Sequence, residues 1–93
     1  MIFICSMLIE ISSKFVRKYK KLPNNIKEKV KLKESLFQAN PFYYQLKTHK
    51  LSGEEKECWS FSIDCSYRIK FIFLEKYRKV LFLDVGTHDE VYD

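Results

Sequence analysis

Three consecutive runs with the residue pattern of β-strands, in the C-terminal half of the chain, constrain its fold more than any other feature. They cover residues 58–64, 67–74 and 79–85. In the first run, Trp59, Phe61 and Ile63 fall on one face and polar residues fall between them, which is typical of a half-buried β-strand. The third run is apolar at nearly every position and predicts a central strand. Because two to five residues connect the runs, we expect antiparallel hairpins.

The N-terminal half predicts one strand followed by two helices. Residues 7–12 alternate as a short strand does, and Ser12 or Ser13 can cap a following helix. Pro23 ends that helix, and Asn40-Pro41 ends the next one, because the residue before a proline disfavours helical geometry. The expected helices run from Ser12 or Ser13 to about Leu22 and over about 24–39. The very short turn between them predicts an antiparallel pair.

These elements predict an α+β fold in the order β-α-α-β-β-β. An N-terminal strand and an antiparallel helical hairpin are expected to pack on a twisted, mainly antiparallel four-stranded sheet. The segment 42–53 is expected to be a loop. Ninety-three residues suit one domain over 1–93, with residues 1–6 a dispensable extension if translation starts at Met7.

The charge distribution suggests a partner that carries phosphates. The chain has a net charge of +5, but Lys14 to Lys50 holds eleven basic and two acidic residues, a net of +9. Such a basic segment suits nucleic acid, although a well-solvated lysine-rich helix shows the same composition. Cys5, Cys58 and Cys65 form no CxxC pair, which favours reduced thiols in the cytoplasm over a disulfide frame or a zinc site. No membrane association is expected.

The residues suited to chemistry are few. The alternation places Ser60, Ser62, Arg68 and Lys70 together on a face of the sheet that we expect to be open, where an RNA backbone could lie. His49 and His88 are the two histidines, both expected in loops, and imidazole transfers protons near neutral pH. No metal site, phosphate-binding loop or dinucleotide motif is present in the sequence, so no cofactor is expected.

Four motifs in order resemble the C-terminal half of RelE/StbE-type toxins of the RelE/ParE superfamily, nearest to the YafQ-like branch. They are LKTHKLSG at 46–53, WSFSID at 59–64, YRI at 67–69 and LDVGTHDEVY at 83–92. The lysine-rich helical pair ending in Asn40-Pro41-Phe42 fits the same pattern, so the likeness covers about residues 7–92.

This resemblance implies a toxin of a type II toxin–antitoxin system that cuts mRNA in the ribosomal A site. Its partners would be a cognate antitoxin, in a toxin–antitoxin hetero-oligomer, and mRNA on the ribosome. The implied chemistry is metal-independent attack of an RNA 2′-hydroxyl on the adjacent phosphate. The implied catalytic residues are His88, His49, Arg68 and Tyr92, and the RNA-binding residues are Lys47, Lys50, Lys70 and Ser62.

The chain departs from the YafQ-like pattern at two positions. Ser62 and Ser66 stand where those enzymes carry a further histidine and an aspartate. Two alternatives therefore stay open beside the endonuclease. One is an inhibitor of DNA gyrase like the ParE toxins, although the paired histidines count against it. The other is a catalytically weak homologue that acts mainly by binding its antitoxin.

Overall fold

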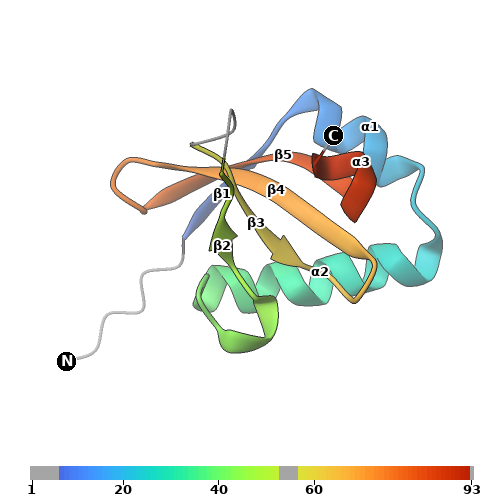
Figure 1. Ribbon diagram of the computed structural model, residues 1–93, viewed down its shortest axis with the longest axis horizontal. Coiled ribbons are helices and arrows are strands. Elements are labelled where there is room, and N and C mark those ends of the chain that lie inside the picture. Colours follow the sequence, from blue (N-terminus) through green and yellow to red (C-terminus); the bar gives the residue numbers. More distant parts are fainter. Residues whose placement is uncertain (1–6, 53–56, 93) are drawn as a thin grey trace.

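The computed structural model describes residues 7–52 and 57–92, except for the side chain of Tyr92. Its elements follow the predicted order, with additions in the middle and at the C-terminal end (Figure 1). They are β1 (Leu8–Ile11), α1 (Ser13–Lys20), α2 (Asn24–Ala39), the 3₁₀ helix η1 (Tyr44–Leu46), β2 (His49–Lys50), β3 (Trp59–Ser62), β4 (Tyr67–Leu74), β5 (Lys79–Thr87) and α3 (His88–Tyr92).

The described strands form one mixed sheet of five, in the order β1-β5-β4-β3-β2. β2 to β5 pair antiparallel, and β1 pairs parallel with β5. The α+β class, the antiparallel hairpins and the central position of β5 are confirmed. The predicted strand count of four is wrong, because His49 and Lys50 pair with Ser60 and Trp59 as an additional edge strand.

Residues 42–52 are more ordered than the loop that their sequence suggests, and Gly53 lies outside the described residues. Leu46 of η1 is fully buried in the core and anchors the segment. The Thr48 hydroxyl donates to the Pro41 carbonyl, which brings the chain back beside the end of α2. A two-residue strand follows. Two residues are too few to show an alternation of apolar and polar side chains. The pairing of β2 therefore depends on the neighbouring β3 rather than on local sequence.

Helix α1 begins as expected and ends slightly early. The Ser12 hydroxyl oxygen accepts a hydrogen bond from the Phe15 N–H, as an N-cap does, and the same hydroxyl donates to the Leu83 carbonyl of β5. At the other end, the N–H groups of Lys21 and Leu22 bond three residues back, which closes the helix before the predicted Leu22. The cap therefore begins α1 and also fastens it to the sheet.

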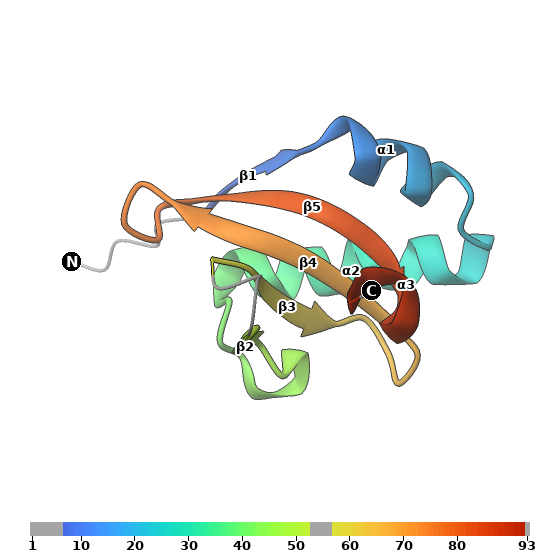
Figure 2. The same cartoon turned by 45° about the horizontal axis from the view of Figure 1, so that its top comes forward.

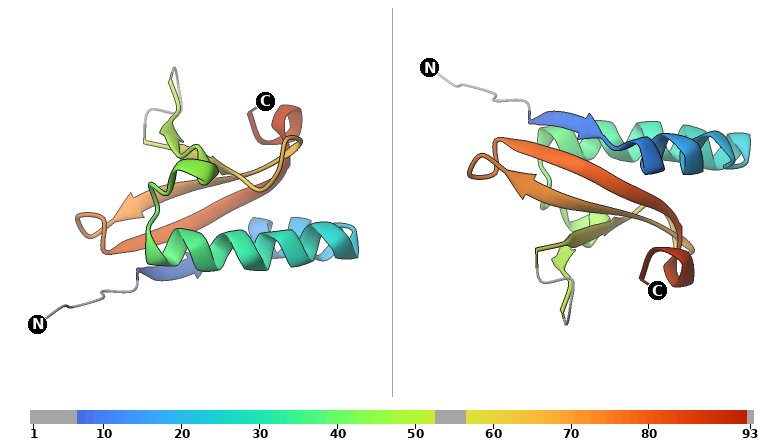
Figure 3. Two further views of the ribbon diagram at one scale, coloured as in Figure 1. Left: turned by 90° about the horizontal axis from the view of Figure 1, so that it is seen from below. Right: turned by 90° about the horizontal axis from the view of Figure 1, so that it is seen from above.

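The two long helices run in opposite directions on one side of the sheet, while α3 lies on the other side (Figure 3). Figure 2 shows α1 beside β1 and β5, whereas α2 crosses behind the strands. A groove of about 210 Å³ between α1 and α2 is lined in part by Tyr19 and Val30. The predicted antiparallel pair is thus observed, although the helices pack mainly on the sheet rather than on one another.

The core is a cluster of phenylalanine rings between α2 and the sheet. Phe37 of α2 is fully buried and contacts Phe61, Phe71 and Phe82, which come from three adjacent strands. Its ring centroid lies 4.5 Å from that of Phe61 and 4.9 Å from that of Phe71. Phe15 of α1 joins the cluster through Phe82. These rings carry much of the buried apolar surface of a small domain.

The turn between β4 and β5 has an unusual backbone. Glu75, Lys76 and Tyr77 have φ angles of 50°, 54° and 71°, although none of them is glycine. Non-glycine residues in this left-handed region cost on the order of 1–3 kcal/mol each. Tyr77 packs on Phe73 at 4.5 Å between ring centroids, and the Arg78 N–H bonds to the Glu75 carbonyl. These contacts hold the turn in that conformation.

No helix within 7–52 and 57–92 is both long and apolar enough to cross a lipid bilayer.

Truncating the central ring should destabilise the fold strongly. We expect Phe37→Ala to lower the free energy of unfolding by about 3–5 kcal/mol, because it leaves a cavity among three strands. Leu32→Ala on the same helix is the matched control, since that side chain is 61% exposed and should change stability by at most about 0.5 kcal/mol. Urea unfolding followed by circular dichroism measures both, and equal effects would contradict the placement of the core.

Candidate active site

The strand register aligns the predicted site residues in two rows across the sheet. In one row His49, Ser60 and Lys70 lie opposite one another on β2, β3 and β4. In the other row Ser62 lies opposite Arg68, and Arg68 lies opposite Gly86 of β5. By alternation these side chains point away from the aromatic core, toward the side of the sheet where α3 lies (Figure 3).

This face is less open than the alternation suggests. Ser60 is fully buried and Ser62 is 9% exposed. The expectation of an open face along β3 is therefore corrected. Periodicity reports which side of the sheet a residue faces, but it does not report what covers that side. Arg68 itself lies over Ser62, and β2 flanks Ser60 as an added edge strand. Ser62 is consequently placed to support a neighbour rather than to contact RNA directly.

The guanidinium of Arg68 is held in place from one side. Its Nη1 donates to the Ser62 hydroxyl at 2.6 Å and to the Asp64 carbonyl oxygen at 3.0 Å. The same nitrogen, Nη1, donates both hydrogen bonds, and Arg68 remains partly exposed. A guanidinium has five N–H donors, so this anchoring fixes its plane while leaving other donors for an anion.

The turn from β3 to β4 is stabilised by the Asp64 carboxylate. Its Oδ1 accepts from the N–H groups of Ser66 and Tyr67, each at 2.8 Å, and its Oδ2 pairs with Lys29 of α2 at 3.3 Å. Burial raises the pKa of the Asp64 carboxyl, but these N–H donors and the ammonium of Lys29 lower it more, so it lies below its ordinary value. The turn that supports Arg68 is thus an anchored element.

His88 directly follows the last residue of β5 and is the first residue of α3, so the expectation of a loop at this histidine is wrong. Its N–H donates to the Ser66 carbonyl at 3.1 Å, which extends the β4–β5 pairing beyond Thr87. Gly86, two residues before His88, lies opposite Arg68 in the strand register. The His88 side chain is 59% exposed, and Nδ1 lies 3.5 Å from the Asp89 carboxylate. The structure therefore brings an exposed imidazole and an anchored guanidinium to the same end of the sheet.

A capping arrangement fixes the start of α3, where His88 is the first residue. The Glu90 carboxylate accepts from both the N–H and the hydroxyl of Thr87, at 2.8 and 3.0 Å. These hydrogen bonds lower the pKa of Glu90 below its ordinary value. Gly86 allows the close approach, because a Cβ there would lie 2.9 Å from Glu90 Oε1. The pattern Thr-x-x-Glu over 87–90 is a capping signal that can be read in the sequence.

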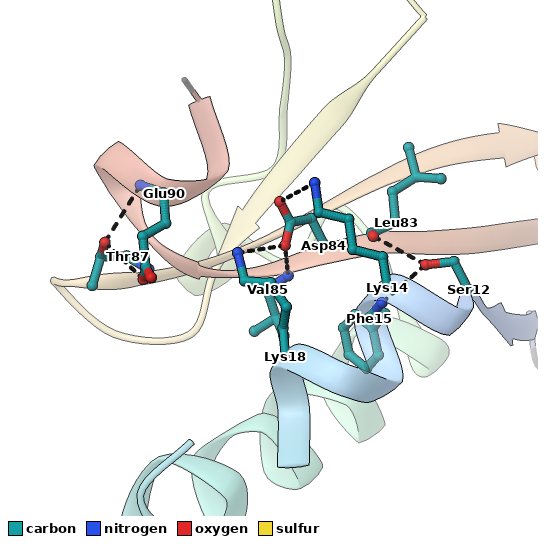
Figure 4. A network of polar contacts seen from close by, with 9 residues as sticks. All are labelled: Ser12, Lys14, Phe15, Lys18, Leu83, Asp84, Val85, Thr87 and Glu90. Carbon is teal, nitrogen blue, oxygen red and sulfur yellow. Dashed lines mark hydrogen bonds and ion pairs between the residues drawn. The ribbon is translucent and has the colours of Figure 1, made fainter. Parts of the chain in front are cut away.

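Helix α1 supports the same strand through a buried ion pair (Figure 4). Asp84 of β5 is 2% exposed, and its carboxylate lies 2.8 Å from Lys18 Nζ and 3.5 Å from Lys14 Nζ. It also accepts from the Val85 N–H. A buried carboxylate without such partners would be strongly destabilising. Lys14 and Lys18, which belong to the basic segment, therefore serve a structural role.

His49 is set apart from this end of the sheet. It is on strand β2, not in a loop, about 10 Å across the sheet from the strand that carries Arg68. Its Nδ1 lies 2.9 Å from the Lys47 carbonyl oxygen, which can only accept, so Nδ1 carries the proton. The exposed Lys47 has a left-handed backbone, with φ 53°, at the end of η1. In this tautomer of the uncharged His49 ring, Nε2 is the acceptor.

The remaining predicted site residues are dispersed. Lys70 is half-buried on the same face as Arg68. Lys50 points to the opposite face, because it lies beside Trp59 in the register. The side chain of Tyr92 lies outside the described residues. Within the part of the chain that the structure describes, no group of three histidine, cysteine or acidic residues is arranged to hold a metal ion.

The fold is that of known toxins. No protein-family model and no curated protein matches the chain. Solved structures match along nearly all of it. YafQ from Escherichia coli strain BL21(DE3) is 20% identical, with a TM-score of 0.76 over 94% of this chain and 99% of that one. A YoeB/ParE toxin from Agrobacterium tumefaciens is 16% identical, with a TM-score of 0.74 over 88% and 99%.

A third match is the toxin–antitoxin complex RelBE2 from Mycobacterium tuberculosis. It is 18% identical, with a TM-score of 0.75 over 89% of this chain and 99% of that one. At these identities the likeness establishes the fold. The expected resemblance to RelE/ParE-superfamily toxins, the YafQ-like branch included, is confirmed at that level.

The cap on α3 can be tested by titration. We expect the pKa of the Glu90 carboxyl to lie below its ordinary value in the folded protein, because it accepts hydrogen bonds from Thr87, and carbon NMR of the side chain measures it. Because its folded pKa is lowered, the stabilisation is complete above the unfolded value of about 4.3 and is lost as pH falls through the folded pKa. Thr87→Ala should raise the Glu90 pKa, whereas Thr87→Ser should not. An unchanged pKa in Thr87→Ala would refute a role for the hydroxyl.

Proposed function

We propose that this protein is the toxin of a type II toxin–antitoxin system and that it cleaves mRNA on the ribosome. The observation that carries the proposal is the placement of Arg68 and His88 at one end of a sheet with the RelE/ParE toxin fold. The proposed domain spans residues 1–93, with residues 1–6 dispensable, and acts in the cytoplasm.

The proposed reaction needs proton transfer and charge stabilisation. The RNA 2′-oxygen attacks the adjacent phosphorus, the bond from phosphorus to the 5′-oxygen breaks, and the products are a cyclic phosphate and a 5′-hydroxyl. His88 acts as the general acid or base, and the anchored Arg68 stabilises the charge that develops on the phosphorane oxygens. The attacking group comes from RNA, so alignment is a large part of the protein's contribution.

The other proposed residues bind and orient the RNA. Lys47 and Lys70 attract the phosphate backbone, and Tyr92 stacks on a base. His49 is on β2, two strands away from Arg68 on β4, so we assign it to a neighbouring phosphate. Its Nε2 becomes a donor when the ring is protonated.

The proposed protein partner is a cognate antitoxin. YafQ has been solved in complex with DinJ, and RelBE2 is likewise a toxin–antitoxin complex. This chain shares their fold over most of its length. We therefore propose that an antitoxin binds this protein in a hetero-oligomer and holds it inactive.

A specific observation favours a second candidate, a weak toxin that acts mainly through antitoxin binding. Ser62 replaces a histidine of the YafQ-like pattern, and its hydroxyl is engaged by Arg68 rather than placed for proton transfer. Ser66 replaces an aspartate, and its carbonyl is engaged by the His88 N–H. Both serines support neighbouring residues, so activity depends more heavily on His88.

Removing the imidazole of His88 tests the proposal. We expect His88→Ala to lower cleavage by about 10²–10⁴-fold, because it removes a proton-transfer group. Expression in cells, followed by mapping of mRNA 5′ ends, should show codon-phased cuts in the wild type that disappear in the variant. His49→Ala is the matched histidine control and should lose less activity.

The other outcomes of this experiment point to different functions. Growth arrest with intact mRNA and a DNA-damage response would indicate gyrase inhibition instead. Absence of arrest with the wild type would favour the weak homologue. Equal thermal unfolding of wild type and variants is required before any of these results is interpreted.

Ser62 should act by positioning Arg68. We expect Ser62→Ala to lower the cleavage rate by roughly tenfold at saturating RNA, because a hydrogen bond to a charged group contributes about 1.5–3 kcal/mol. Ser62→Thr keeps the hydroxyl and should recover most of the rate. If Ser62 had a purely structural role, Ser62→Ala and Ser62→Thr would lower the free energy of unfolding equally. Alternatively, they would change KM and leave kcat unaffected.

A further inference from the structure

A second recess lies on the face of the sheet opposite to Arg68. It has a volume of about 250 Å³ and opens beside the turn between β4 and β5. Trp59 lines it, and Trp59 points away from the side that carries Ser60 and Ser62. We call it the hairpin cleft. Its lining residues are Lys50, Glu57, Trp59, Phe73, Lys76 and Tyr77.

Aromatic rings form a connected row along the hairpin cleft. Ring centroids lie 5.7 Å apart for Phe42 and Trp59, 5.2 Å for Trp59 and Phe73, and 4.5 Å for Phe73 and Tyr77. Phe42 is 51% exposed and Tyr77 is 58% exposed. The row therefore continues from the edge of the core to the surface, and contiguous exposed apolar side chains are a mark of interaction sites.

The turn that bears Lys76 and Tyr77 keeps both side chains at the cleft. Their backbones, like that of Glu75, are in the left-handed region without the help of glycine. Such conformations persist where surrounding contacts impose them and are frequent at ligand sites. Here the contact of Tyr77 with Phe73 fixes the exposed ring beside the cleft before any ligand binds.

The charges at the cleft suit a nucleotide. Lys50 and Lys76 contribute ammonium groups, and within residues 7–52 and 57–92 neither forms an ion pair. Glu57 contributes a carboxylate that can accept hydrogen bonds from an amino group on a base edge, as acidic side chains do with cytosine. Aromatic faces between cations match an unpaired base with a phosphate on each side.

We infer that the hairpin cleft binds an unpaired nucleobase of single-stranded RNA. The base stacks on the aromatic row, and Lys50 and Lys76 contact the flanking phosphates. Glu57 favours a base with an amino group over uracil. An acidic peptide fits less well, because the Glu57 carboxylate at the cleft repels the carboxylates of such a peptide. The assignment of RNA as the ligand rests on the proposed function. The shape and charge of the cleft are observed independently of that proposal.

The edge strand β2 connects the cleft to the proposed cleavage face. His49 and Lys50 are consecutive, so their side chains point to opposite faces, His49 beside Ser60 and Lys50 beside Trp59. An RNA that passes over this two-residue edge meets His49 on one side and Lys50 on the other. The cleft would thus hold nucleotides beside the scissile one.

Trp59 is the single tryptophan of the chain, so its fluorescence reports directly on the cleft. The full-length protein is titrated with a 2′-O-methyl hexanucleotide, which lacks the attacking hydroxyl and is not cleaved. We expect saturable quenching. Tyr77→Ala should weaken binding roughly 5- to 150-fold, and Lys76→Gln should reduce the logarithmic salt dependence by about 0.7. Tyr44→Ala, 75% exposed outside the cleft, is the matched control and should bind normally.

The outcomes separate this inference from the proposed function. Arg68→Ala should abolish cleavage of unmodified RNA while Trp59 quenching persists, and that result supports the cleft whatever the toxin assay shows. Failure of the oligonucleotide to quench, or unchanged binding by Tyr77→Ala, overturns the inference. Quenching by a glutamate-rich peptide but not by RNA also overturns it and assigns the cleft to a protein partner.

Discussion

The ring contacts of Phe37 hold the structure together. This side chain projects from α2 onto phenylalanines of β3, β4 and β5, so a single buried group connects the helical layer to three neighbouring strands. In a domain of this size the core is close to the minimum that stabilises a fold. With that core on one face of the sheet, Ser60, Ser62, Arg68 and Lys70 lie on the opposite face, and the strand register decides which of them become neighbours.

Acidic residues organise the candidate site even though they are not proposed to touch RNA. Asp64 stabilises the turn before Arg68, Asp84 fastens α1 to β5, and Glu90 caps the helix that begins at His88. Each of these carboxylates binds N–H groups or lysine ammonium groups that would otherwise be free to bind phosphate. The strong positive charge of the segment 14–50 is therefore partly used within the protein, and net charge alone overstates the surface available to RNA.

The sequence predicted the fold well because its signals were local. Alternation identified β3 to β5, and the prolines marked the ends of the helices. β2 and α3 were missed because elements of two and five residues have no measurable period and form where longer neighbours offer pairing and caps. The burial of Ser60 and Ser62 was also missed, since it depends on what crosses the face. The capping role of Glu90 was readable, because Thr87 precedes it at the diagnostic spacing.

The two faces of β3 divide the candidate functions of this molecule. Ser62 and Ser60 face the side with Arg68, where polar groups are anchored and partly buried, which suits chemistry on one phosphate. Trp59 faces the other side, where exposed rings and lysines suit contact with an unpaired base and its flanking phosphates. Strand alternation alone produces this division. An endonuclease that must hold a flexible single strand while reacting at one bond needs both kinds of surface. A protein that only binds an antitoxin needs neither the anchored guanidinium nor the aromatic row.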